Sequence, residues 1–164
     1  MLLLRIYKKI KRLLFTFIAK LTLSDSLPKN IKVNNYSRFS KSTLIGSDCH
    51  FNGMIILGKG RVSIGDGFHS GKGCEIITDV HNYLGDKLPY DDQYIIKDVI
   101  IGNNVWIGKG VTILGGVNIG EGAIVQAKSV VVSDVEPLSI IGGHPARKFS
   151  ERDKEHYQNL KIKI

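Results

Sequence analysis

From residue 95 to residue 135, one branched apolar residue recurs at every sixth position. The series is Ile95, Ile101, Ile107, Ile113, Ile119, Val125 and Val131. A second series follows four residues behind it and is small or branched: Val99, Val105, Val111, Val117, Ala123, Ser129 and Val135. A period of six fits neither the 3.6-residue period of a helix nor the alternation of a lone strand. It is typical of a β-helix, in which each hexad forms one flat face.

Glycine follows the branched residue at Gly102, Gly108 and Gly120. We expect the branched residue to point into the coil, the second-series residue to fill the corner, and glycine to permit the turn. Successive coils then stack at strand spacing, so that backbone hydrogen bonds run between coils over a core of layered Ile and Val. Parallel crossovers are normally right-handed, and the spacing itself does not fix the hand of this coil.

The hexads begin less regularly before residue 77. Ile45, Phe51 and Leu57 keep the six-residue step, and the register then slips by one and resumes at Ile64, Ser70 and Ile76. Cys49 and Cys74 take the corner position, which predicts buried, inert thiols rather than reactive ones. We expect a helix and connector over residues 1–42, the solenoid over 43–149, and a tail over 150–164 that is a short helix or simply solvated.

Residues 1–23 read as an amphipathic helix, because an apolar stripe and a basic stripe run along it at helical spacing. The apolar stripe is Leu3, Ile6, Tyr7, Ile10, Leu13, Leu14, Phe17 and Leu21, and the basic stripe is Arg5, Lys8, Lys9, Arg12 and Lys20. The charges are too many for a membrane span. Two interpretations stay open: an interfacial helix on an anionic leaflet, or a cap on the open end of the solenoid. One helix can do both.

The chain of 164 residues suffices for one domain. The first 20 residues carry six of the formal +8 charge, so that the solenoid itself is not a basic surface. With no helix-turn-helix or finger spacing, no nucleic-acid partner is expected. Two cysteines make no disulfide framework and no cleavable signal peptide is evident, which predicts a cytoplasmic protein, with contact at the inner membrane face if the first helix is interfacial.

The hexads stop between Ile76 and Ile95, and residues 82–94 form a loop rich in tyrosines and acids. A long loop leaving a uniform coil indicates a functional face. His81 is the histidine that lies where coil gives way to loop, and a neutral imidazole there can accept a proton from an alcohol or amine. Asp79 or a loop acid would orient the ring. Alternatively, His81 merely hydrogen-bonds the loop base.

Three runs carry a resemblance: residues 101–108 (IGNNVWIG), 116–120 (GVNIG) and 143–147 (GHPAR). They resemble the hexapeptide-repeat acyltransferases, and more narrowly the O-acetyltransferases of sugars and polysaccharides, similar to maltose, galactoside and nodulation-factor acetyltransferases. The resemblance spans residues 45–149 and is strongest from 95 to 149. It implies an all-β solenoid, a left-handed parallel β-helix, assembled as a homotrimer with its active site in a groove between neighbouring coils.

The resemblance also implies direct acetyl transfer from acetyl-CoA to a saccharide acceptor, with His81 as general base and no metal. It places Trp106 near the reaction site and assigns the CoA path to Lys109, Ala127, Val132, Ser133 and Arg147. The alternative for Trp106 is a packing role without contact to substrate. A guanidinium such as that of Arg147 suits phosphate. Combined with the basic first helix, it suggests lipid-linked saccharides of surface polysaccharide synthesis. Gln126 and Lys128 depart from the family pattern, which usually has glycine there, and His144 replaces Asn or Val.

Several alternatives remain open. An amino-sugar N-acetyltransferase or an antibiotic-modifying acetyltransferase would use the same scaffold and base. A β-helix carbonic anhydrase would need three histidines around zinc, and only His69 and His81 are a plausible pair. A purely structural solenoid would need neither the loop nor the terminal GHPAR turn.

Overall fold

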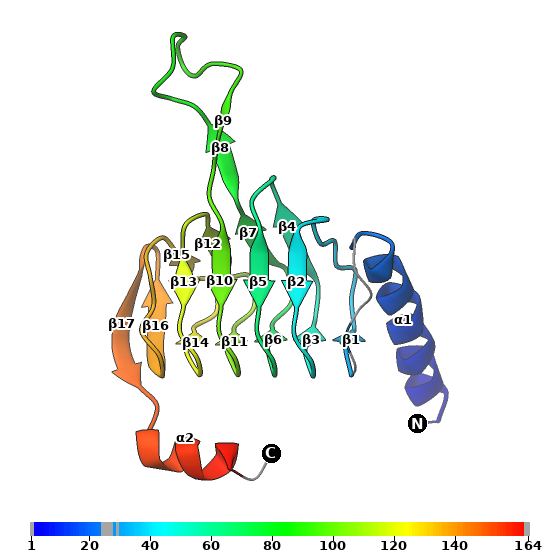
Figure 1. The fold of residues 1–164 in the computed structure, drawn as a ribbon. Coiled ribbons are helices and arrows are strands. Elements are labelled where there is room, and N and C mark those ends of the chain that lie inside the picture. The colour runs from blue at the N-terminus through cyan, green and yellow to red at the C-terminus, as the bar shows by residue number, and fades with distance from the viewer. Residues whose placement is uncertain (1, 24–27, 29, 163–164) are drawn as a thin grey trace.

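Three sheets of short strands wind into a three-sided solenoid, with a helix near each end and one projecting arm (Figure 1). The computed structural model describes residues 2–23, 28 and 30–162. The connector expected between residues 24 and 42 therefore lies partly outside the described residues.

Each sheet is one wall of the solenoid, and we call the walls A, B and C. Wall A contains β1 (Lys32–Val33), β3 (His50–Phe51), β6 (His69–Ser70), β11 (Trp106–Ile107), β14 (Ile124–Val125), β16 (Ser139–Gly143) and β17 (Ala146–Glu151). Wall B contains β4 (Met54–Leu57), β7 (Cys74–Ile77), β12 (Thr112–Leu114) and β15 (Val130–Val131). Wall C contains β2 (Thr43–Ile45), β5 (Val62–Ile64), β10 (Val99–Ile101) and β13 (Asn118–Ile119). The antiparallel pair β16–β17 ends wall A, and the other neighbours in the three walls are parallel.

The strand register confirms the hexad period. Trp106 pairs with Ile124, and Thr112 pairs with Val130, eighteen residues further along in each case. One coil is therefore three hexads, one for each wall. Both predicted series are buried from residue 99 onward, and together they form the core: Val99, Ile101, Val105, Ile107, Val111, Ile113, Val117, Ile119, Ala123, Val125, Ser129, Val131 and Val135.

Two of the predicted inward positions are wrong. Ile95 belongs not to a coil but to β9 (Tyr94–Ile96), which pairs antiparallel with β8 (Asp79–His81) in the arm. Leu57 is half-buried, and Ile56 takes the inward place instead, because it pairs with the buried Ile76. The turn before β4 is one residue shorter than the hexad period requires, so the slip in register comes earlier than predicted.

The two cysteines lie inside the solenoid, as expected. Cys49 and Cys74 are fully buried and free. Burial raises the pKa of the Cys49 thiol to about 11 and also raises the pKa of Cys74. The prediction of inert thiols at inward corners is therefore confirmed in its structural part.

A predicted helix is present at each end. Helix α1 (Leu2–Lys20) lies beside β1, with Ala19 fully buried and Phe15 packed against the core. Strand β1 shows that the parallel pairing already begins at Lys32. Helix α2 (Lys154–Lys161) follows β17, and the Asp153 side chain caps it by accepting a hydrogen bond from the backbone N–H of His156 (2.6 Å).

Candidate functional site

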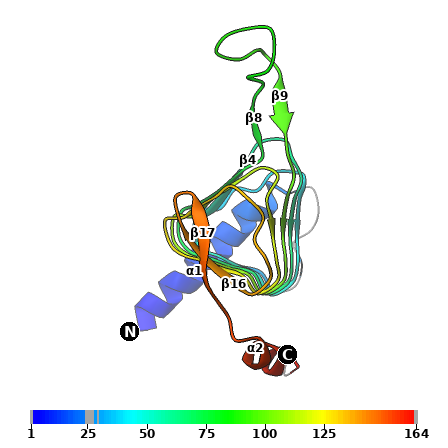
Figure 2. The ribbon, with the colours of Figure 1, turned by 90° about the vertical axis from the view of Figure 1, so that its left-hand side faces the viewer.

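The arm interrupts the solenoid at one corner of its triangular cross-section. The chain leaves wall B after β7, forms β8 and β9, and re-enters wall C at β10. Viewed along the solenoid, the arm rises from this corner, and wall A lies on the opposite side (Figure 2). His81 ends β8 and pairs with Tyr94 of β9, so it lies at the base of the irregular loop, as predicted.

Two tyrosines hold the His81 ring. Its centroid lies 3.9 Å from that of Tyr90, in a stacked arrangement, and 4.5 Å from that of Tyr94. Nδ1 of His81 is buried and has no hydrogen-bond partner among the residues that the structure describes. Aromatic packing therefore fixes the ring. The tyrosines of this segment were noted in the sequence but were given no role. The available signal was the presence of Tyr90 and Tyr94 in the loop that follows His81.

The acids of this region make other hydrogen bonds. The Asp79 carboxylate accepts from the backbone N–H of Lys59 (3.2 Å), on the neighbouring coil. In the loop, Asp91 accepts from the Asn82 amide (2.9 Å) and from the backbone N–H of Gln93 (2.8 Å). Asp79 thus ties the arm to the solenoid and Asp91 closes the loop, and no hydrogen bond between either acid and His81 is found in the described part of the chain.

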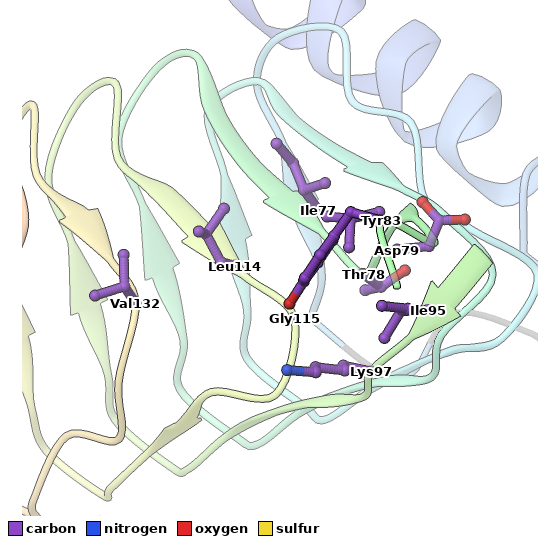
Figure 3. A pocket seen from close by; sticks show the side chains of 10 residues that line it. Ile77, Thr78, Asp79, Tyr83, Ile95, Lys97, Leu114, Gly115 and Val132 are labelled. Carbon is purple, nitrogen blue, oxygen red and sulfur yellow. The ribbon is translucent and has the colours of Figure 1, made fainter. Parts of the chain in front are cut away.

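A cavity of about 230 Å³ lies at the base of the arm (Figure 3). Its apolar wall consists of Ile77, Leu114 and Val132, and Leu114 pairs directly with Ile77. The other lining residues come mainly from the arm and its return: Thr78, Asp79, Val80, Tyr83, Ile95, Lys97 and Gly115. The cavity is therefore an apolar groove that runs along the coils and has the Lys97 ammonium group near the arm.

Gly115 leaves room for the Lys97 side chain in this groove. A Cβ at Gly115 would lie 3.0 Å from Cβ of Lys97 and 3.1 Å from its carbonyl oxygen. Figure 3 shows the Lys97 amine reaching toward the Gly115 side of the cavity. Thr78, which is fully buried, accepts the backbone N–H of Lys97 on its carbonyl (2.8 Å). Sequence reasoning missed Thr78 and Lys97, although both directly flank the arm.

The groove adjoins a second cavity at the end of the solenoid. Ser133 and Arg147 both line this cavity, which has a volume of about 330 Å³, and Ser133 directly follows Val132 of the first groove. Lys148 contacts Glu151 (3.0 Å) and Glu136 (3.3 Å), and its hydrogen bond to Glu151 raises its pKa. Of the residues predicted for CoA, Ser133 and Arg147 thus line the same cavity, and Val132, which precedes Ser133 in the chain, lines the first groove.

The remaining predicted residues lie elsewhere on the prism. Trp106 is half-exposed on wall A, where it lines a cavity of about 300 Å³ with His69 and Arg152. Lys109 follows β11 at the corner between walls A and B, and its carbonyl accepts the backbone N–H of Lys128, the residue after Ala127 (2.8 Å). Since wall A is opposite the arm, Trp106 and His81 do not meet within one chain.

The carbonic anhydrase alternative required His69 and His81 to bind one zinc ion together, and the structure separates these two histidines. His69 is on wall A, and His81 is on the arm. No group of three metal-binding side chains is found within residues 2–23, 28 and 30–162.

Comparisons with known proteins agree with this architecture. The family model described as "Bacterial transferase hexapeptide (six repeats)" matches residues 98–133. A probable macrolide acetyltransferase of Lysinibacillus sphaericus is 48% identical over 67 residues, covering 41% of this chain and 37% of that protein. The galactoside O-acetyltransferase of Escherichia coli K12 is 29% identical over 126 residues, covering 74% of this chain and 62% of that protein.

A solved galactoside acetyltransferase in complex with coenzyme A has a similar fold. Its TM-score is 0.72 at 26% identity, over 87% of this chain and 72% of the solved one. The aligned parts span only 37%, 32% and 26% of the length of three curated relatives, the macrolide acetyltransferase and two chloramphenicol acetyltransferases. Taken together, the hexad register, the family model and these relatives show that the chain belongs to the hexapeptide-repeat acyltransferase family.

Proposed function

We propose that this protein is an acetyl-CoA-dependent O-acetyltransferase whose acceptor is a hydroxyl group of a sugar or lipid-linked saccharide, used in surface polysaccharide synthesis. The observation that carries the proposal is the arm, which holds the His81 imidazole between two tyrosines and whose base lines a groove running along the coils. Relatives that acetylate galactosides, one of them solved with coenzyme A, support the substrate class. The free, buried thiols suit a reducing compartment, and we place the reaction in the cytoplasm.

The proposed chemistry needs one base and one thioester. The acceptor oxygen attacks the acetyl carbonyl while the His81 imidazole takes the hydroxyl proton; the C–S bond then breaks, and the CoA thiolate recovers a proton from the imidazolium. Because Nδ1 is buried, Nε2 is the nitrogen that can meet the acceptor. Backbone N–H groups of a neighbouring coil would stabilise the oxyanion, an effect of about 3 kcal/mol per donor.

The two adjoining cavities suggest a path for CoA within one chain. The apolar groove ending at Val132 suits the pantetheine arm, and Ser133 and Arg147 lie further along. Arg147 would meet the phosphates, because a guanidinium binds phosphate in a bidentate manner. In this proposal Asp79 has a positioning role: it fixes the arm to the backbone of Lys59 and does not contact the imidazole.

We also propose that the solenoid is left-handed and that the chain assembles into a homotrimer. The complete site then lies between two chains of this trimer. Trp106, Lys109 and Ala127 lie away from the arm of their own chain. If they contribute to the same thioester site as His81, they do so across an interface from the next copy. Trp106, half-exposed on wall A, is suited to such a contact.

A second candidate is an acetyltransferase that modifies antibiotics. It is favoured by the 48% identity to a probable macrolide acetyltransferase, although over only 41% of this chain. An amino-sugar N-acetyltransferase remains the third reading of the same scaffold.

A thiol-release assay with acetyl-CoA separates these candidates. The acceptors are maltose, galactosides, lipid-linked oligosaccharides, amino sugars, chloramphenicol and a macrolide, with mass spectrometry of the product to distinguish ester from amide. We expect acceptor-dependent release with a hydroxylated saccharide and an ester product. Turnover of only the antibiotics or only the amino sugars would replace the proposal by one of the other two.

A further inference from the structure

Helix α1 presents a continuous apolar face that no part of the described chain covers. Its large apolar side chains are between 45% and 82% exposed: Leu2, Leu3, Ile6, Tyr7, Ile10, Leu13, Leu14 and Phe17. The stripe continues to Leu21, just after the helix. Apolar patches of this extent on a folded protein mark an interaction site.

The opposite face of α1 attaches the helix to the solenoid. Lys11 donates to the Asn35 side chain (2.6 Å), Arg12 donates to Asn34 (3.1 Å), and Ala19 is fully buried. Figure 2 shows that α1 crosses the end of the solenoid and that its N-terminal part extends beyond it. The cap predicted from the sequence is therefore made by one face of α1, which leaves the apolar face directed outward.

The charge of α1 is of one sign. Its 19 residues include six Lys or Arg and no acid. At helical spacing, Arg5, Lys9 and Lys20 lie along one edge of the apolar face, and Lys11 and Arg12 are on the docked side. An apolar face bordered by cations complements a surface that is apolar below and anionic above, which is the boundary between acyl chains and headgroups of an acidic bilayer.

We propose that α1 anchors the protein to an anionic membrane surface by lying in the plane of the bilayer. No helix among the described residues is long and apolar enough to cross a membrane. Ile6, Ile10 and Leu13 enter the acyl boundary, while Arg5, Lys9 and Lys20 meet the headgroups. The solenoid then stands on the membrane by its first coil, and the arm projects from the side of the solenoid (Figure 1).

A second copy of this chain is the other conceivable occupant of the apolar face. Packing two such helices face to face would bring together two helices whose charged residues are all cationic, and these charges repel each other. An anionic bilayer neutralises the same charges, and each Lys or Arg near its surface strengthens binding about fivefold. The charge distribution therefore favours the membrane.

The test is sedimentation of the full-length protein with vesicles. Vesicles of equal parts phosphatidylcholine and phosphatidylglycerol are compared with vesicles of phosphatidylcholine alone. One variant carries Ile10→Ser and Leu13→Ser, and its matched control carries Leu160→Ser and Ile162→Ser, which alter two exposed apolar residues at the other end of the chain. A third variant carries Arg5→Gln and Lys9→Gln. The melting temperature of each variant verifies that it folds.

We expect the protein and the Leu160/Ile162 control to sediment with the anionic vesicles and to stay in solution with phosphatidylcholine alone. The Ile10/Leu13 variant should bind at least about tenfold more weakly. The affinity of the Arg5/Lys9 variant for anionic vesicles should fall about 25-fold, since each lost cation costs about fivefold. Equal binding to both vesicle types, or no binding at all, would overturn the proposal. So would an Ile10/Leu13 variant that changes the oligomeric state in the absence of lipid. The readout needs no turnover, so it is independent of the proposed reaction.

Discussion

At the scale of single residues, the stacked histidines of wall A stand out. The rings of His50 and His69 lie 4.1 Å apart, centroid to centroid, on neighbouring strands. Burial lowers the pKa of both, and the charges of His69, Lys32 and Arg12 lower that of His50 further, opposed by Asp48. With a lowered pKa in the folded state, the unfolded chain binds more protons just below the ordinary histidine value.

The pair therefore predicts loss of stability on acidification. The free energy of unfolding should be unaffected by the pair above the ordinary pKa of about 6.5 and should fall as the pH drops below it, until the lowered folded pKa values are passed. Urea unfolding at about pH 7.5 and about pH 5.5 measures this decrease. His69→Gln should make the decrease smaller, and His156→Gln, in α2, should leave it unchanged. An equal decrease in all three proteins would contradict the assignment.

Lys128 shows what the sequence could predict at a single position. Its φ of 64° is in the left-handed region, as is that of Gly110 at the same turn one coil earlier (67°). The departure noted from the sequence, a lysine where the family has glycine, thus marks a turn whose conformation favours glycine. The sequence identified this position, but nothing in it could locate Tyr90 against His81, since stacking depends on the path of the arm.

At the scale of elements, strand β10 predicts a sharp contrast between neighbours. Ile101 is 2% exposed and Ile100 is 53% exposed, because successive side chains in a strand point to opposite faces. Ile101→Ala should lower the free energy of unfolding by about 2 to 5 kcal/mol, through lost burial and the cavity left in the core layer. Ile100→Ala should change it by about 0.5 kcal/mol or less.

Urea denaturation of the two variants measures both changes. Comparable losses for Ile100→Ala and Ile101→Ala would show that the outer face of wall C is buried in an assembly or that the inward series is misplaced. In the second case, the solenoid core predicted from the hexads would need revision.

Element prediction succeeded where the period was strict and failed where it was broken. From Val99 to Val135 the six-residue spacing alone placed every inward residue. Near β4, one residue fewer in a turn moved the inward position from Leu57 to Ile56, and periodicity carries no signal for such a deletion. The arm was expected as a loop, yet its base is a strand pair, which placed Ile95 outside the coil. The β16–β17 hairpin was not foreseen.

At the scale of the whole molecule, the candidate site is divided between walls. The sequence and the family resemblance singled out His81 and the CoA residues, but they could not show that Trp106 lies opposite the arm, since this depends on how many residues each corner takes. The proposals drawn from the arm, from the groove ending at Val132 and from the outward face of α1 together describe an enzyme that works beside a membrane surface and completes its site with a neighbouring copy. That description depends first on the imidazole in the arm.

The most direct measurement is CoA release by variants of His81, compared with CoA affinity measured by calorimetry. His81→Gln retains bulk between Tyr90 and Tyr94, His81→Ala removes it, and His156→Ala is the control. We expect both His81 variants to lose at least about 100-fold in turnover, because a positioned base contributes about 10² to 10⁴, while CoA binds as before and the control keeps full activity. Turnover by His81→Gln and His81→Ala equal to that of the unaltered protein would show that His81 is not the base.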